Sequence, residues 1–83
     1  MRKQIAEILA HPDNGWRVKC ANPARVAELI RMLAESMVLP PIVLGHGGEL
    51  LDGKHRIAAA LARGESEIEY EITRDPAPGT ARG

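Results

Sequence analysis

The chain has 83 residues, of which 45% are hydrophobic, and its eleven basic and eleven acidic side chains give a formal net charge of zero. This length suits one small domain, close to the lower limit for a self-sufficient core. The balanced charge argues against nucleic-acid binding driven by bulk charge, although it is compatible with a local basic site. The single cysteine, Cys20, allows no internal disulfide and favours a cytoplasmic location. Because the sequence has no long apolar run, we expect neither a signal peptide nor a membrane span.

The first quarter of the chain predicts a helix, a turn and a strand. Apolar residues at helical spacing indicate a short helix over residues 3–10. Residues 11–15 are rich in turn-forming types and predict a turn. In residues 16–20 apolar and basic side chains alternate, which predicts a short strand with Trp16 and Cys20 buried.

The middle of the chain predicts a helix followed by a hairpin. Asn22 is a favourable N-cap with a proline directly after it, so a helix is expected over residues 23–36. Its apolar face, which we expect to lie in the core, consists of Val26, Leu29, Ile30 and Leu33. Two consecutive prolines then lead into a short buried strand over residues 42–44. The glycine-rich residues 45–48 predict a hairpin turn that returns through residues 49–51.

The last part of the chain predicts a helix, a strand and a tail. A helix is expected over residues 55–63, with Gly64 as its natural stop. In residues 67–72 apolar side chains alternate with glutamates, which indicates a half-exposed strand. Residues 73–83 contain prolines and glycines without a large apolar side chain, and we expect them to be disordered.

Together these elements predict an α+β fold. We expect a single domain over residues 1–72, in which helices pack on a small mixed β-sheet. The strands of this sheet would come from residues 16–20, 42–44, 49–51 and 67–72.

The most informative part of the sequence is an Asp-Gly pair at the start of an alanine-rich helix. The residues are, in order, Asp52, Gly53, Lys54, His55 and Arg56. The free N–H groups and the dipole at a helix start favour an anion. A glycine lets a ligand come close to the backbone, and the three basic-capable side chains add charge and hydrogen-bond donors. The combination predicts a phosphate or carboxylate pocket.

Three segments also share a pattern with a known family. They are Pro41-Ile42-Val43-Leu44, continued by a glycine turn and Leu51-Asp52-Gly53-x-His55-Arg56-x-Ala58-Ala59; the turn His11-Pro12-Asp13-Asn14-Gly15-Trp16-Arg17; and the helix Val26-x-x-Leu29-Ile30-x-x-Leu33-x-x-Ser36. This arrangement resembles the ParB/sulfiredoxin superfamily over roughly residues 5–72. The resemblance implies a small α+β fold and a phosphate-binding pocket. By position, Gly53, His55 and Arg56 would face phosphates, and Arg17 would close the pocket.

The resemblance has two departures that narrow the expected activity. ParB proteins bind and hydrolyse CTP, sulfiredoxins use ATP to repair an over-oxidised cysteine, and related free-serine kinases use a similar turn for a nucleotide. Lys54 stands where sulfiredoxins have their reactive cysteine, so sulfiredoxin activity is not expected. The sequence also lacks the downstream Glu-Asn-x-x-Arg element and the helix-turn-helix domain of ParB proteins, so specific DNA binding by this chain alone is not expected.

Three functions stay open at this point. The first is binding of a phosphate-bearing ligand, such as ATP or CTP with Mg²⁺, with little or no turnover because no general base is evident. The second is a non-enzymatic interaction or inhibitor protein of a phage or plasmid, acting on a protein partner or as a homodimer. The third is a DNA-associated or weak nuclease module. Two residues each have two possible roles. Trp16 would stack on a base or lie in the core. Asp52 would hold a metal ion bound to phosphates or cap the helix expected over residues 55–63. The histidines show no spacing for a zinc site.

Overall fold

The computed structural model describes residues 1–74 and has the predicted α+β class, with four helices and a four-stranded mixed sheet. Along the chain the elements are β1 (Arg2–Gln4), α1 (Ile5–Leu9), α2 (Pro12–Lys19), α3 (Pro23–Ala34), β2 (Ile42–Leu44), β3 (Leu50–Asp52), α4 (Lys54–Ala62) and β4 (Glu67–Ile72). Of the tail expected over residues 73–83, residues 75–83 lie outside the described part. No helix within residues 1–74 is long and apolar enough to cross a membrane.

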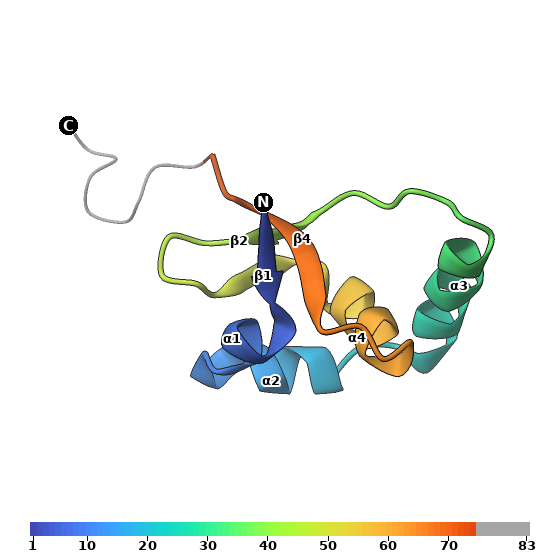
Figure 1. Ribbon diagram of the computed structural model, residues 1–83. Helices are drawn as coiled ribbons and strands as arrows, with labels where there is room; N and C mark the ends of the chain where they lie inside the picture. Colours follow the sequence, from blue (N-terminus) through green and yellow to red (C-terminus); the bar gives the residue numbers. More distant parts are fainter. Residues whose placement is uncertain (75–83) are drawn as a thin grey trace.

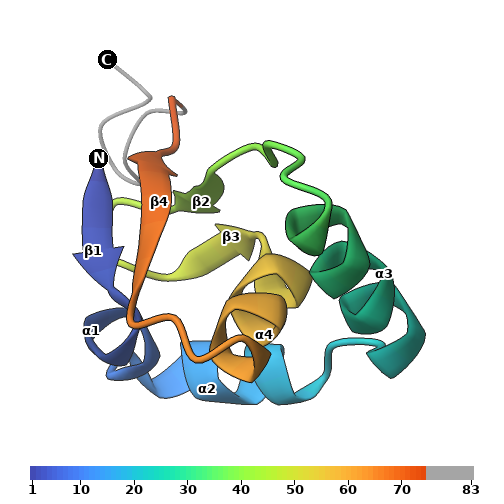
Figure 2. The same ribbon diagram turned by 45° about the vertical axis from the view of Figure 1, so that its right-hand side comes forward.

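The sheet has the strand order β1-β4-β2-β3. β4 pairs with β1 in the antiparallel sense and with β2 in the parallel sense, and β2 and β3 form the antiparallel hairpin that the sequence predicts. In Figures 1 and 2 α1, α2 and α4 lie below the strands, and α3 lies to one side. The core consists of buried side chains of α1, α4 and the sheet, namely Ile5, Ile8, Ile42, Leu44, Leu50, Ile57, Ala60 and Ile68.

The strand predicted over residues 16–20 is wrong, because this segment belongs to helix α2. His11 is the N-cap, with its Nδ1 accepting a hydrogen bond from the Asp13 N–H at 3.2 Å. Pro12 takes the first helical position, where its missing N–H costs nothing. The place in the sheet is filled instead by β1, of which Lys3 and Gln4 were expected to be helical. The turn expected at residues 11–15 is thus the start of a helix.

Helix α3 follows the prediction, but its apolar face is only partly core. Leu29 is buried, whereas Val26, Ile30 and Leu33 are half-buried. The reason is that α3 packs mainly against α4 and lies beside the sheet, as Figure 2 shows. Leu29 is accordingly buried outside the main core cluster.

Helices α3 and α4 end in the same way. In each case the residue after the C-cap has a positive φ, which is 64° at Ser36 and 78° at Gly64. The following N–H groups bond back to carbonyls of the last turn, from Met37 to Met32 at 3.1 Å and from Glu65 to Ala60 at 2.9 Å. This is the Schellman arrangement, which normally has glycine at the position that Ser36 occupies. Gly64 therefore stops α4 as predicted.

Candidate functional site

The turn between β3 and α4 is built around Gly53. Its φ is +112°, a conformation that L side chains rarely adopt. A Cβ placed here would lie 2.5 Å from Cγ2 and 2.8 Å from Cβ of Ile42, a buried core residue. The sequence suggested that Gly53 serves close approach of a ligand, but in the structure it also lets the turn pack against β2. Gly53 is itself the N-cap of α4, so the capping role considered for Asp52 is wrong.

Two clefts flank this turn, and the six predicted site residues are divided between them. The first, here called the tryptophan cleft, has a volume of about 250 Å³ and includes Trp16, Arg17, Cys20, Leu50, Leu51 and Lys54 in its lining. The second, here called the arginine cleft, has a volume of about 300 Å³ and includes Arg25, Leu29, Met32, Leu39, His55 and Arg56. Asp52 and Gly53 line both clefts. Arg17 and Lys54 thus lie on one side of the turn, and His55 and Arg56 on the other.

α2 and β3, which both line the tryptophan cleft, are joined by Asn14, a fully buried residue. Its Nδ2 donates to the carbonyl oxygens of Ile8 at 2.8 Å and of Gly48 at 2.9 Å, and its Oδ1 accepts from the Leu50 N–H at 2.8 Å. One side chain therefore joins α1, the hairpin turn and β3 to α2. The sequence indicated only a turn residue here, and no local signal identifies a long-range contact of this kind.

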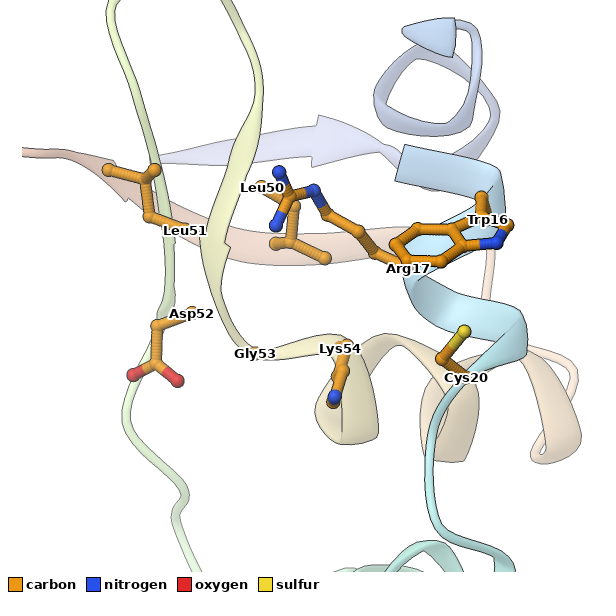
Figure 3. Close-up of a pocket in the computed structure, with 8 residues that line it drawn as sticks. All are labelled: Trp16, Arg17, Cys20, Leu50, Leu51, Asp52, Gly53 and Lys54. Atoms are coloured by element: carbon orange, nitrogen blue, oxygen red, sulfur yellow. The ribbon is translucent and has the colours of Figure 1, made fainter. Parts of the chain in front are cut away.

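Trp16 and Cys20 are exposed, contrary to the expectation that both are buried. The exposed fraction of Trp16 is 67%. In a helix, residues four apart share a face, and α2 turns Asn14 and Val18 inward. Trp16 and Cys20 therefore lie on the outer side of the helix, where they border the tryptophan cleft (Figure 3).

The two cations of the tryptophan cleft have no protein partner in the described part of the chain. Neither Arg17 nor Lys54 makes a side-chain hydrogen bond or ion pair within residues 1–74. In Figure 3 the side chain of Arg17 extends from α2 in the direction of β3, whereas Lys54 points away from that guanidinium. Asp52 lies on the opposite side of Gly53 from Trp16. The positive charge of this cleft is therefore spread over two separated points.

In the arginine cleft, His55 is held by the connection between α2 and α3. Its Nε2 accepts a hydrogen bond from the Asn22 N–H at 3.0 Å. Nε2 is therefore unprotonated, and a neutral imidazole in this state carries its proton on Nδ1. Asn22 also caps α3 as predicted, since its Oδ1 accepts from the Ala24 N–H at 2.9 Å. His55 fixes the position of α3 against the first turn of α4 and keeps one donor, Nδ1, uncommitted by any described contact.

Arg56 is the most unusual side chain of the arginine cleft. Its Nε and Nη1 are buried and have no hydrogen-bond partner among the described residues, which leaves Nη2 as the guanidinium nitrogen that reaches solvent. Arg25 lines the same cleft from α3 and pairs with Glu28 at 2.8 Å on the exposed surface. Asp52 also lines the cleft, but it makes no ion pair with either arginine in residues 1–74.

The first turn of α4 adds backbone N–H donors to the positive charge of Arg56 and Arg25. The first helical bond of α4 runs from the Ile57 N–H to the Gly53 carbonyl at 2.9 Å. The N–H groups of Lys54, His55 and Arg56 precede it and have no partner within the helix. Among residues 1–74, no three His, Cys, Asp or Glu side chains converge as a metal site. The backbone N–H groups of α4 and the arginine side chains can therefore hold an anion in the arginine cleft.

Comparisons of the chain with protein-family models, with curated proteins and with solved structures found no match. The resemblance to the ParB/sulfiredoxin superfamily therefore stays a prediction, and the two clefts are the features of the molecule that bear on its function.

Proposed function

We propose that this protein binds a phosphate-bearing ligand, a nucleotide such as ATP or CTP, in the arginine cleft. The observation that carries the proposal is the guanidinium of Arg56, with two buried nitrogens that no described residue satisfies. A buried donor without a partner costs about 1–3 kcal/mol, and more when it is charged. Such a cost is offset when an anion occupies the cleft and neutralises the cation, and phosphate oxygens suit a guanidinium.

The surroundings of Arg56 favour a phosphate group over an isolated small anion. The free N–H groups of the first turn of α4 and its dipole act at the same place, and Arg25 adds a second cation from α3. Apolar side chains of α3 and the following segment form the rest of the lining, namely Leu29, Met32 and Leu39. They offer a surface on which the less polar part of a nucleotide can lie.

Mg²⁺ would be held mainly by the phosphates. Asp52 is the carboxylate among the described residues that line the arginine cleft. One carboxylate together with phosphate oxygens is a common Mg²⁺ environment. We expect little or no turnover, because the Nε2 of His55 is already committed to the Asn22 N–H and the carboxylate of Asp52 would be occupied by Mg²⁺.

The test is a calorimetric titration of the full chain with ATP, CTP and inorganic phosphate, each with and without Mg²⁺. We expect at least one nucleotide to bind more tightly than phosphate. Arg56→Gln should weaken binding roughly ten- to a hundred-fold, because a charge-assisted contact contributes about 1.5–3 kcal/mol. Arg25→Gln should weaken it less, since Arg25 is exposed and shared with Glu28.

Arg31→Gln is the matched control, because Arg31 is an exposed cation of the same helix α3 that does not line the arginine cleft. Its affinity for nucleotide should equal that of the unmodified chain. If no nucleotide binds at millimolar concentration, or if Arg31→Gln and Arg56→Gln lower the affinity equally, the proposal is wrong.

A further inference from the structure

The tryptophan cleft has features that phosphate binding in the arginine cleft does not use. Trp16 comes from α2 and borders this cleft while 67% exposed. Leu50 of β3 continues the apolar surface inward, where it is buried. Exposed tryptophan is costly in water, and tryptophan beside arginine is the composition enriched at the centres of protein interfaces.

The charges around this apolar surface are positive and unpaired within residues 1–74. Arg17 and Lys54 line the cleft without a hydrogen bond or ion pair, and they point in different directions in Figure 3. The one acidic side chain of the lining, Asp52, lies beyond Gly53 as seen from Trp16 (Figure 3). A complementary ligand therefore carries at least two separated negative charges with an apolar group between them.

We infer that the tryptophan cleft docks an acidic segment of a partner protein. One apolar or aromatic side chain of that segment would lie against Trp16 and Leu50, while carboxylates on either side meet Arg17 and Lys54. This arrangement matches the charges and the apolar wall at once, and electrostatic complementarity of this kind determines specificity and association rate. A single phosphate, in contrast, cannot reach two cations that point apart.

A nucleic acid fits the same surface less well. An exposed indole and two cations can also hold a stacked base. However, a phosphate backbone is followed by a broad row of cations, whereas the lining of this cleft offers Arg17 and Lys54. Aliphatic Leu50 lies opposite α2 in the lining, where a protein side chain packs better than a second base.

Trp16 is the only tryptophan of the chain, so its fluorescence reports directly on this cleft. The experiment titrates the full chain with short synthetic peptides in which glutamates flank one phenylalanine. Two comparison peptides replace the glutamates by glutamine or the phenylalanine by serine, and an oligothymidylate represents nucleic acid. We expect a blue shift of the Trp16 emission with the acidic peptides, weakened by salt, and none with either comparison peptide.

Substitutions then locate the contact. Arg17→Gln and Lys54→Gln should each lower the affinity for the acidic peptide about five- to tenfold. Lys19→Gln is the matched control, because Lys19 is an exposed cation of the same helix outside the cleft lining, and it should change the affinity less than about twofold. Arg25→Gln, which affects the arginine cleft only, should leave peptide binding unchanged, so the two proposals can fail separately.

Three results would overturn this inference. One is that none of the acidic peptides shifts the emission of Trp16. Another is that the oligothymidylate binds more tightly than every peptide, which would assign the cleft to nucleic acid. The third is that Lys19→Gln weakens peptide binding as much as Arg17→Gln, which would indicate diffuse attraction and no defined cleft.

Discussion

Replacing Arg56 by methionine should make this protein more stable and, at the same time, weaken the binding of its ligand. Arg56→Met keeps an unbranched side chain as far as the position of Nε and removes the two buried N–H-bearing nitrogens that lack partners. We expect a gain of about 1–2 kcal/mol in the free energy of unfolding, at the lower end of the cost of an unsatisfied buried group because Nη2 still reaches solvent. In a domain of this size, such a gain corresponds to a rise in Tm of about 4–16 °C.

The assay is thermal unfolding followed by circular dichroism, with and without nucleotide. At a ligand concentration about a hundred times the Kd of the unmodified chain, binding should stabilise that chain by about 2.7 kcal/mol and the variant by only about 0.4–1.4 kcal/mol. The Tm advantage of the variant should therefore shrink or reverse when ligand is added. Arg25→Met is the control: it breaks only the exposed pair with Glu28, which is worth about 0.2–1 kcal/mol, so its Tm without ligand should fall slightly. If Arg56→Met lowers the Tm more than this control does, the guanidinium contributes to the fold and our reasoning about Arg56 is wrong.

Three further substitutions test the packing around the clefts. Asn14→Ala should lower the free energy of unfolding in urea by roughly 2–4 kcal/mol, because three backbone groups lose their partner; a loss under about 0.5 kcal/mol would contradict its role. Ser36→Gly should raise stability by about 0.5–1 kcal/mol, since glycine accepts a positive φ without strain, and a lower Tm would count against this. Gly53→Ala should cost roughly 2–4 kcal/mol in the same urea assay, because its methyl group would meet Ile42, and a variant as stable as the parent would refute the clash.

Much of the fold was predictable because it depends on local signals. The cap and proline at the start of α3, the glycine after α4 and the alternation in β4 each act within a few residues. β1 lacks such a signal: its three residues are polar or charged, and they form a strand because they pair with β4 far along the chain. The alternation in residues 16–20 is compatible with a strand, but the same residues also extend a helix capped by His11. A periodicity of two over so few residues does not separate these outcomes.

The candidate site was predictable in its chemistry but not in its geometry. The donors and cations of residues 52–56 follow from residue types at a helix start, which the sequence displays directly. The division into two clefts depends on α2 and α3 lying on different sides of the turn, and that follows from long-range contacts. Asn14 holds α2 to β3, and His55 holds the start of α3 to α4. The exposure of Trp16 follows from the same placement of α2.

The two clefts share Asp52 and Gly53, so a ligand in one cleft lies close to the lining of the other. However, energetic coupling requires an element with two alternative arrangements that both ligands bias. The contacts of the turn oppose a second arrangement, because Gly53 lies against Ile42 in the core and its carbonyl accepts the first hydrogen bond of α4.

We therefore expect the two clefts to bind independently. A saturating nucleotide should change the Kd of the acidic peptide, measured through Trp16, by less than about threefold, which corresponds to a coupling free energy under about 0.7 kcal/mol. The small change that remains would come from the added phosphate charge acting on Lys54 across the turn, so it should weaken peptide binding and diminish at high salt. The control repeats the peptide titration in Arg56→Met, where the same nucleotide concentration should have a smaller effect. A change of more than tenfold that persists at high salt would show that the turn moves, and that Gly53 is a hinge despite its contact with the core.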